Sequence, residues 1–367
     1  MATELGIALA RKGHSVHFVS YSQPARLPHF IENTFFHEVG VASYPLFEYP
    51  PYESALAGKL VDVAEFENLD LLHVHYAIPH AFAGFFAKQI LHTRGINIPI
   101  VTTLHGTDIT IVGKDASLQP VVEFSINHSD VVTTVSKSLQ QDTCANFNIT
   151  KEIDVIPNFI DFNRFSKTDK SHFKKAIAPE GEKILVHTSN FRKVKRVDDV
   201  IKAFKKVRDT LPAKLLLIGD GPERQQLETL CREMKVCNDV RFLGKQDAVE
   251  ELLTVSDVFL MASEKESFGL AALEAMACEV PVISTNTGGL PELNIHGKTG
   301  YLNDVGDVDA MAESIIRLLR SDNLLAQFKK NAFEQAQKFD LKAVLPMYEA
   351  AYQKALQSVN CPTAANF

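Results

Sequence analysis

Residues 263–293 read SEKESFGLAALEAMACEVPVISTNTGGLPEL, and this stretch decides the fold. It predicts a helix that opens at residues 267–269 and runs to about Cys278, because small and apolar residues fill it. The following segment, Val280–Ser284, is a continuous apolar run, as expected of a parallel strand covered on both faces. Another such run, Val258–Met261, precedes the loop. Strand, loop, helix and strand in this order indicate a parallel α/β sheet.

The same alternation extends over the rest of the chain and pauses only in the polar segment 157–182. We therefore predict two Rossmann-like, doubly wound α/β domains, residues 1–160 and 161–340, that face each other across a cleft. A last helix at 341–357 could complete the first domain. The other strand candidates are His14–Ser20, Leu71–His75, Ile100–Leu104, Val131–Val135, Ile184–Thr188, Lys214–Ile218 and Val240–Leu243, and the helical segments include Glu53–Asn68, Val197–Thr210, Pro222–Met234 and Asp309–Arg320.

Composition narrows the function classes. The chain has 367 residues and a net charge of −7, whereas nucleic-acid binders usually carry a basic surplus. No apolar run approaches the roughly 20 residues of a membrane helix, and no signal peptide is evident, so we expect a cytoplasmic protein. The five cysteines form no C-x-x-C pair, which favours free thiols.

The thirteen histidines raise the question of a metal site. His73 and His75 alternate along a predicted strand, and we expect them to face opposite sides and not to share an ion. No H-E-x-x-H sequence or Cys/His cluster is present. The sequence therefore predicts no metal site.

Two carboxylates, Glu266 and Glu274, stand eight positions apart around the start of the helix after residue 267. Unpaired N–H groups at a helix start suit a phosphate or a sugar oxygen, and Gly269 would let a ligand approach the backbone. We expect each carboxylate to accept hydrogen bonds from one hydroxylated part of a ligand, as carboxylates hold ribose in nucleotide folds. The alternative is an amphipathic helix with Glu274 facing solvent.

A basic turn follows the first strand of the second domain, in the segment SNFRKVKRVDDV at 189–200. Such cations suit a diphosphate, because Arg binds in a fork and Lys acts as a point charge. The alternative is a solvated charged turn. The sequence leaves open which of the four side chains point inward, namely Arg192, Lys193, Lys195 and Arg196.

Polar clusters also end two strands of the first domain. Carboxyl ends of parallel strands meet at one edge of a sheet, so two such clusters favour ligand binding, although a single histidine is more often structural. No nucleophile elbow or Walker A sequence is present. The clusters are HVHYAIPHA (73–81), with His75, Tyr76 and His80, and TTLHGTD (102–108), with Thr102, Thr103, His105 and Asp108.

Together these motifs resemble the retaining GT-B glycosyltransferases of family 4. Glu266 and Glu274 in ESFGLAALE match the E-x7-E pattern of that family. In the first domain, residues 37–64, 69–81 and 102–113 resemble the branch that acts on L-malate in bacillithiol biosynthesis. Further matches are VIPNFIDFNRF (155–165), NFRKVKR (190–196), GDGP (219–222), GGLPE (288–292) and GKTGYL (297–302).

The resemblance implies transfer of N-acetylglucosamine from UDP-N-acetylglucosamine to the hydroxyl of L-malate, with retention of the α configuration and release of UDP. It implies no metal and no cofactor. The leaving phosphate takes the acceptor proton in such enzymes, so neither glutamate is expected to act as a nucleophile. The resemblance assigns Arg192 and Lys195 to the leaving diphosphate, Glu274 to the ribose, Glu266, Phe268, Gly269 and Leu270 to the donor sugar, His105 to a catalytic position beside that sugar, and Tyr76, Thr102 and Thr103 to the acceptor.

The family pattern also includes a strand and a glycine-rich loop before the helix that here starts near Thr3, and the sequence contains neither. We therefore expect that roughly 20 upstream residues are lacking. Two alternatives stay open: the same fold and donor with a different acceptor, and a nucleotide-sugar-binding module that is inactive without the loop. The sequence does not give the oligomeric state, so a homo-oligomer stays open, and the tail CPTAANF has no assigned role.

Overall fold

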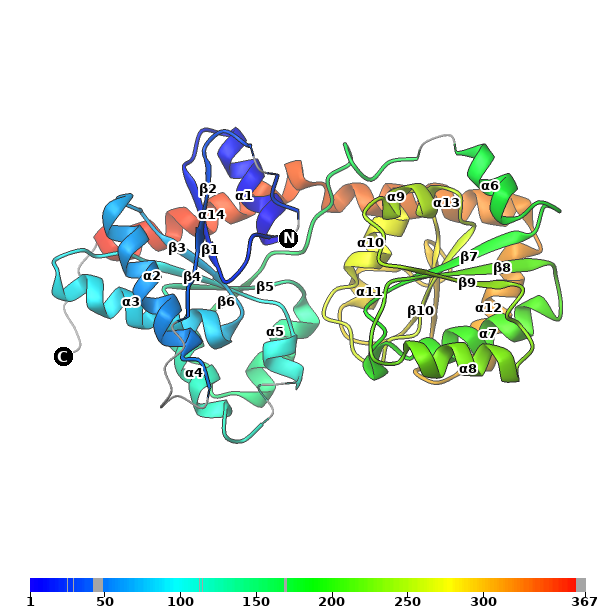
Figure 1. Cartoon of the computed structure of the whole chain (residues 1–367), viewed down its shortest axis with the longest axis horizontal. Coiled ribbons are helices and arrows are strands. Elements are labelled where there is room, and N and C mark those ends of the chain that lie inside the picture. The colour runs from blue at the N-terminus through cyan, green and yellow to red at the C-terminus, as the bar shows by residue number, and fades with distance from the viewer. Residues whose placement is uncertain are drawn as a thin grey trace. The chain divides into compact units, whose positions relative to one another are not determined.

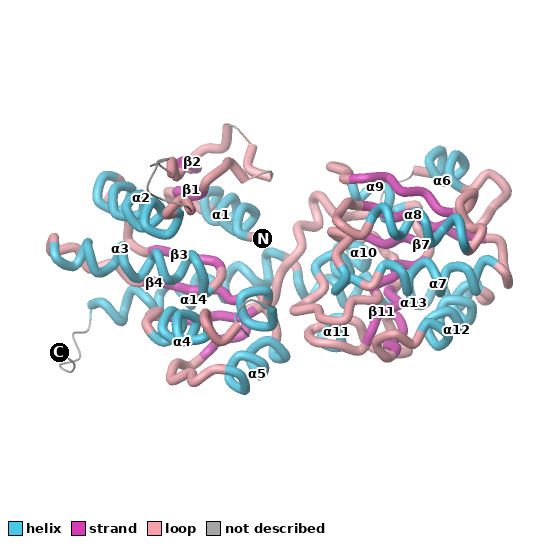
Figure 2. The backbone as a smooth tube through the Cα atoms, turned by 60° about the horizontal axis from the view of Figure 1, so that its bottom comes forward, coloured by secondary structure: helices cyan, strands magenta, loops and turns pink. Residues whose placement is uncertain are grey.

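The computed structural model describes residues 1–24, 26–28, 30–41, 49–111, 113, 115–167 and 170–360, so the tail CPTAANF lies outside the described residues. The chain divides into two compact units (Figures 1 and 2). Unit 1 comprises Met1–Pro157 and the chain from Lys342 on, and unit 2 comprises Asn158–Leu341. Among the described residues, every helix is too short or too polar to cross a lipid bilayer.

Unit 2 is built on a six-stranded sheet with the order β12-β11-β10-β7-β8-β9, and all neighbours are parallel. Numbered along the chain, this order is 3-2-1-4-5-6, that of a doubly wound dinucleotide fold. The order reverses between β7 and β10, and ligands of such sheets bind beyond the carboxyl ends of the strands at this point. The strands are β7 (Lys183–Thr188), β8 (Ala213–Ile218), β9 (Val240–Gly244), β10 (Val258–Met261), β11 (Val282–Thr285) and β12 (Gly300–Asn303).

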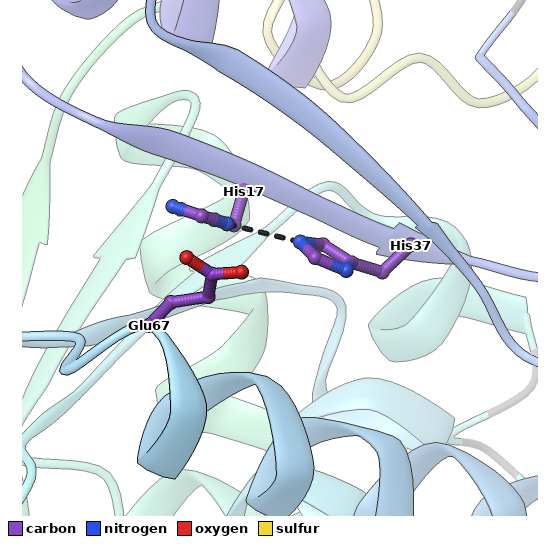
Figure 3. Close-up of side chains that lie close together, drawn as sticks. All are labelled: His17, His37 and Glu67. Atoms are coloured by element: carbon purple, nitrogen blue, oxygen red, sulfur yellow. Dashed lines mark hydrogen bonds between the residues drawn. The ribbon is translucent and has the colours of Figure 1, made fainter.

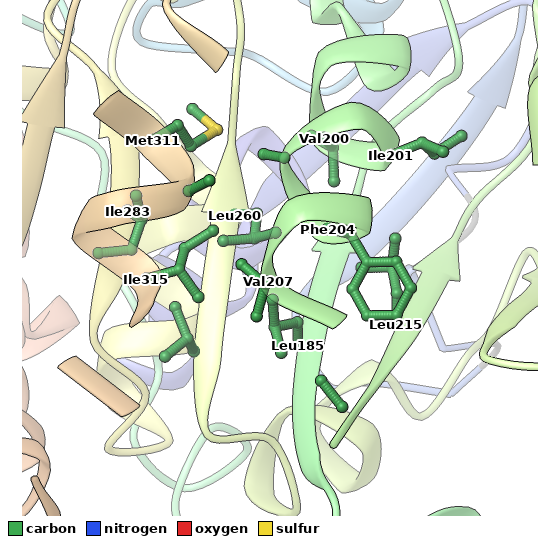
Figure 4. Packing of buried hydrophobic residues seen from close by; sticks show 14 of the residues in the cluster. Leu185, Val200, Ile201, Phe204, Val207, Leu215, Leu260, Ile283, Met311 and Ile315 are labelled. Carbon is green, nitrogen blue, oxygen red and sulfur yellow. The ribbon is translucent and has the colours of Figure 1, made fainter. Parts of the chain in front are cut away.

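Helices α7 (Val197–Arg208) and α12 (Val308–Leu319) pack on this sheet (Figure 4). In α7, Val200, Phe204 and Val207 repeat at helical spacing, and all three are fully buried in one cluster with Leu185 of β7. Ile315 of α12 belongs to the same cluster. The remaining helices are α6 (Ser171–Ile177), α8 (Arg224–Glu233), α9 (Val249–Thr254), α10 (Leu270–Ala277), α11 (Leu290–Leu293) and α13 (Asp322–Ala336), with the short turns η4 (Lys193–Lys195) and η5 (Gln337–Phe339).

Unit 1 contains a four-stranded parallel sheet, β3-β4-β5-β6, and a separate parallel pair, β1-β2. The strands are β1 (Val16–Ser20), β2 (Thr34–Glu38), β3 (Leu72–His75), β4 (Ile100–Leu104), β5 (Val131–Thr134) and β6 (Ile153–Val155). The helices are α1 (Ala2–Arg11), α2 (Tyr52–Phe66), α3 (Phe82–Thr93), α4 (Gln119–Asn127), α5 (Lys137–Asn146) and α14 (Leu341–Asn360), and the short turns η1 (Ala77–Ala81) and η2 (Thr107–Ile111) follow β3 and β4.

The core of unit 1 joins α2 and α3 to the four-stranded sheet. Leu60 of α2 and Leu91 of α3 are buried in one cluster with Val74 and Ile100 of the strands. Helix α14 is fastened to the same unit, because the hydroxyl of its Tyr352 lies 2.9 Å from Nδ1 of His73. The C-terminal helix therefore completes the surroundings of β3.

Several predicted details are wrong. Helix α10 begins at Leu270, because Gly269 adopts a φ of 96° before it and keeps residues 267–269 in the loop. Helix α8 begins at Arg224, two residues after Pro222. The expectation that His73 and His75 face opposite sides is also wrong: positions two apart on a strand share a face, and their ring centroids lie 4.4 Å apart.

Candidate functional site

Two loops meet at the point in unit 2 where the strand order reverses. One follows β7 and carries Lys195, and the other follows β10 and carries Glu266. The Lys195 ammonium lies 2.6 Å from a Glu266 carboxylate oxygen, and the Glu264 N–H donates to the carbonyl of Val194 at 2.8 Å. The basic turn and the acidic loop that the sequence assigned to one ligand are therefore in direct contact.

The four cations of the basic turn have different surroundings. Arg196 has a φ of 47°, and its Nε donates to Asp199 at 2.6 Å. This hydrogen bond raises the pKa of the Arg196 guanidinium and ties it to the first turn of α7. Lys195 pairs with Glu266, while Arg192 and Lys193 are exposed and form no ion pair with another described residue. Arg196 is therefore committed to the helix, and Arg192 and Lys193 are open to solvent.

Glycines allow the neighbouring backbones to approach the acidic loop. Gly288 has a φ of 55°, and a Cβ there would lie 1.9 Å from the carbonyl oxygen of Glu266. The Gly289 N–H donates to that same oxygen at 2.9 Å. The double glycine therefore packs against the loop, and the Gly289 N–H is used in a hydrogen bond inside the protein.

The first turn of helix α10 directly follows this loop. Phe268 is buried, and its ring meets Phe339 edge-on at 5.5 Å, so only its backbone can serve a ligand. Leu270 is partly accessible at the first turn. Glu274 is only 7% exposed, which excludes the alternative of a solvent-facing side chain. A carboxylate so deep in an apolar helix requires hydrogen-bond partners.

His187 of β7 is hydrogen-bonded to the end of β10 and to the start of the basic loop. It was not predicted as a site residue. Its Nδ1 lies 2.8 Å from the carbonyl of Leu260, and because a carbonyl only accepts, Nδ1 donates. Nε2 then accepts from the Ser189 hydroxyl at 2.7 Å. Burial lowers the pKa of His187 to about 4, so the ring is neutral at neutral pH. The sequence feature that could have identified His187 is a histidine within an otherwise apolar strand.

In unit 1, the carboxyl ends of β3 and β4 bring the two polar clusters together. Nε2 of His105 lies 2.8 Å from Nδ1 of His75, and the Tyr76 ring centroid lies 5.0 Å from that of His105. Tyr76 has a φ of 78°, which turns the chain at the end of β3. A hollow of about 150 Å³ is lined by Tyr76, Ile78, Thr107 and Asp108.

Asp108 holds the two clusters in place, a role that the sequence alone does not reveal. Its carboxylate accepts from the Ala77 N–H at 2.8 Å and from the Gly106 N–H at 3.0 Å. Burial is the largest influence on this carboxyl and raises its pKa, although the backbone N–H groups oppose the shift. Asp108 thus connects the turn after β3 to the turn after β4.

The assignment of Thr102 and Thr103 as direct acceptor ligands is wrong, because both are fully buried in β4. The Thr102 hydroxyl bonds to Ser129 at 2.7 Å. The Thr103 hydroxyl lies 2.8 Å from Nε2 of His73 and 2.7 Å from the Thr133 hydroxyl. The two threonines support the strand end from inside.

The histidines of this cluster are uncharged. Burial lowers the pKa of His73 to about 3, that of His105 to about 4, and that of His75 well below its ordinary value. At neutral pH His105 therefore offers a hydrogen-bonding imidazole and no positive charge. Among the described residues, the only group of three metal-ligating side chains lies elsewhere in unit 1.

Comparisons with known proteins agree with this architecture. The chain matches the models of Glycosyltransferase Family 4 over residues 1–164 and of Glycosyl transferases group 1 over residues 168–335. It is 49% identical over 359 residues to N-acetyl-alpha-D-glucosaminyl L-malate synthase of Bacillus anthracis, which covers 97% of this chain and 93% of that enzyme.

Solved structures show the same fold. Sucrose-phosphate synthase from Thermosynechococcus elongatus is 22% identical with a TM-score of 0.79, covering 97% of this chain and 92% of that one. Anabaena HepE, solved in complex with UDP-glucose, is 21% identical with a TM-score of 0.80, covering 96% and 95%. The chain therefore belongs to glycosyltransferase family 4, has the GT-B fold of that family, and is a glycosyltransferase.

Proposed function

We propose that the enzyme transfers N-acetylglucosamine from UDP-N-acetylglucosamine to the hydroxyl of L-malate, with retention of the α configuration and release of UDP. One observation carries this proposal: the 49% identity that extends over 97% of the chain to an enzyme named for this sugar and this acceptor. The geometry of each unit agrees with a division of labour in which unit 2 binds the donor and unit 1 binds the acceptor.

In unit 2, the contact between the two loops supports a role in holding the diphosphate. Lys195 is oriented by Glu266, so a positive charge is fixed beside the start of α10 before the reaction begins. Such a preorganised charge stabilises the negative charge that grows on the leaving group. Arg192, exposed on the same turn, is proposed to contact the same diphosphate.

Helix α10 is proposed to hold the remainder of the donor. The partly accessible first turn at Leu270 leaves its N–H groups near the surface, where a helix start favours electron-rich oxygens. Glu266 and the backbone of Phe268, Gly269 and Leu270 are assigned to the sugar. Glu274, buried in the same helix, is assigned to the ribose hydroxyls.

In unit 1, the hollow beside Tyr76 is proposed to receive the acceptor. Its volume of about 150 Å³ suits a small molecule better than a polymer. Burial raises the pKa of the Tyr76 phenol, so its hydroxyl remains a hydrogen-bond donor for an acceptor carboxylate. His105, neutral and held by His75, is proposed to hydrogen-bond a hydroxyl close to the reacting centre.

The proposed reaction needs no protein nucleophile and no metal ion. The acceptor hydroxyl attacks the anomeric carbon on the face that the diphosphate leaves, the C–O bond to the diphosphate breaks, and the acceptor proton passes to the leaving phosphate. Glu266 and Glu274 therefore bind hydroxyls and do not form a covalent intermediate.

The test is incubation of the enzyme with UDP-N-acetylglucosamine and a panel of hydroxy acids, sugars and sugar phosphates, with UDP measured by chromatography. We expect UDP release with L-malate, an α-linked product by NMR, and no effect of a chelator. Release with another acceptor but not with malate would favour the second candidate, a family-4 enzyme with a different small acceptor, since one fold of this kind serves many chemistries. Donor binding without UDP release would indicate a binding module.

A further inference from the structure

A cluster of ligating side chains lies in unit 1 on elements that the proposed reaction does not use. His17 belongs to β1, His37 belongs to β2, and Glu67 directly follows α2. In the parallel register, His17 pairs with Phe35 and Val19 pairs with His37, so both imidazoles project from the same face of the two-stranded sheet. Figure 3 shows the two rings side by side, with the Glu67 carboxylate turned toward them.

The spacing of these side chains suits one ion. Nδ1 of His17 lies 2.9 Å from Nε2 of His37, and one ligating atom of each of the three residues lies within 4.8 Å of the other two. Ligand atoms in a tetrahedral zinc site, with bonds of about 2.0–2.2 Å, are roughly 3.3 Å apart. Side-chain adjustments of about an ångström are therefore sufficient to reach ligating geometry.

His17 is also held as metal-ligating histidines usually are. Its second ring nitrogen, Nε2, lies 3.3 Å from the Ser15 hydroxyl, and the Phe35 ring stacks on it at 4.7 Å. A hydrogen bond from the outer nitrogen fixes which nitrogen faces the metal and how the ring is oriented. Ser15 thus hydrogen-bonds a ligand residue without contacting the ion itself.

The carboxylate beside the two imidazoles favours a cation, although the positively charged Lys59 lines the same hollow as His37. Glu67 caps the C-terminal end of α2, where the helix dipole already carries partial negative charge. Among the described residues no hydrogen bond or ion pair holds its carboxylate. Burial lowers the pKa of both His17 and His37, although Glu67 opposes the shift, and neutral imidazoles are the form that binds a metal.

The cluster is reachable from solvent. A hollow of about 510 Å³ is lined by His37 and Glu67, together with Lys59 and Asp62 of α2. It gives an ion a way in and leaves room for water in a fourth position. Two imidazoles, one carboxylate and water form a ligand set that suits Zn²⁺ and related ions better than Ca²⁺ or Mg²⁺.

We propose that His17, His37 and Glu67 bind one divalent transition-metal ion, of which Zn²⁺ is the representative, with water as the fourth ligand. The ion joins β1 and β2 to the end of α2. It takes no part in glycosyl transfer, so the site is compatible with a metal-independent reaction.

Calorimetric titration of the chelator-treated enzyme with Zn²⁺ alone tests the proposal. We expect one ion per chain, and we expect His17→Gln, His37→Gln and Glu67→Gln each to weaken binding by more than the roughly 10- to 100-fold that loss of an outer partner costs. Ser15→Ala should weaken binding by about tenfold, at the lower end of that range. His92→Gln, an exposed histidine on α3 of the same unit, is the matched control and should bind as the parent does.

A second measurement does not depend on affinity. With Cu²⁺ as the probe, electron paramagnetic resonance should show coupling to two imidazole nitrogens in the parent enzyme and to one in His37→Gln. Circular dichroism of each variant should match the parent, which separates loss of a ligand from loss of folding. No binding by the parent enzyme, or an unchanged copper spectrum in both folded histidine variants, would overturn the proposal.

Discussion

The ammonium nitrogen of Lys195 lies 2.6 Å from a carboxylate oxygen of Glu266, although the two residues are 71 positions apart in the chain. They belong to the loops after β7 and β10, the two strands between which the order of the sheet reverses. The contact depends on β7 and β10 lying side by side in the parallel sheet, so that the loops after both strands meet at one edge. The pair therefore lies at the edge of the sheet where ligands of this fold bind.

Lys195→Ala should reduce turnover more than it weakens donor binding. In the proposed reaction this positive charge stabilises the negative charge that develops in the transition state, and removal of one such group typically costs about 10²- to 10³-fold in kcat. The salt bridge is partly accessible, so the free energy of unfolding should change by only about 1 kcal/mol. Steady-state kinetics with UDP-N-acetylglucosamine measure the effect, and Arg192→Ala should behave similarly.

The control for these variants is Lys330→Ala, which removes an exposed cation from α13 of the same unit. It should leave both kinetic constants unchanged. If Lys195→Ala raised only KM, the charge would serve ground-state binding, and the assignment to the leaving group would be wrong.

Glu274→Gln should weaken donor binding while keeping the size of the side chain. Hydrogen bonds to a charged group contribute about 1.5–3 kcal/mol, which corresponds to a loss of roughly 10- to 150-fold in affinity. The binding constant for UDP is measured by calorimetry. Glu233→Gln, an exposed site at the end of α8, is the control. Equal affinity of Glu274→Gln and the parent enzyme would remove Glu274 from the ribose site.

Gly288→Ala should disturb Glu266 through its backbone. An added Cβ would lie 1.9 Å from the Glu266 carbonyl oxygen, so the loop has to move. We expect a loss of roughly 1–3 kcal/mol in the free energy of unfolding and about 10²-fold in turnover, since small displacements of positioning groups are costly. Melting curves and kinetics give the two values.

Comparison with Gly181→Ala distinguishes the effect of the clash with Glu266 from the effect of a positive φ. Gly181 also has a positive φ, 81°, but a Cβ there would meet no atom within 4 Å. This variant should lose about 1 kcal/mol of stability from strain alone and keep full activity. Comparable losses of activity in the two variants would show that the contact with Glu266 is not the cause.

The alternation of strands and helices could be predicted from the sequence because continuous apolar runs mark buried parallel strands. Ile100–Leu104 and Val258–Met261 were located to the residue. Three strands were missed: β2, β6 and β12. β6 (IDV) has only three residues, and β2 (TFFHE) and β12 (GYLN) mix polar residues or glycine with apolar ones, so no continuous apolar run marks any of the three.

Site residues could be predicted where a motif follows a strand end. They could not be predicted where the burial of a side chain determines whether it can reach a ligand. Lys195 and Glu266 follow predicted strands, so their proximity could be inferred. Thr102 and Thr103 look like surface polar residues in the sequence, yet hydrogen bonds inside the sheet let β4 bury them completely. His17 and His37 are 20 residues apart and meet only because β1 and β2 pair in parallel register.

Tyr76→Phe should affect the acceptor and not the donor. The phenol lines the hollow of unit 1, and loss of one neutral hydrogen bond costs about 0.5–1.5 kcal/mol, or roughly 2- to 12-fold in the KM for malate. Tyr49→Phe, which alters an exposed tyrosine of the same unit, is the control. A rise in the KM for the sugar nucleotide alone would place Tyr76 in the donor site instead.

Acid should destabilise the folded enzyme through its buried neutral histidines. The pKa of His187 is about 4 in the folded protein and about 6.5 when unfolded, so between these values only the unfolded chain takes up the proton. The free energy of unfolding therefore falls as the pH decreases through this window, by up to about 2 kcal/mol at about pH 5 for this residue. Melting temperatures measured from about pH 7.5 to about pH 5 should fall accordingly.

The variant His187→Gln cannot take up this proton, so its melting temperature should depend less steeply on pH even if it starts lower. An identical slope in the variant and the parent would show that His187 does not carry the effect and that other buried histidines, such as His73 and His105, dominate it.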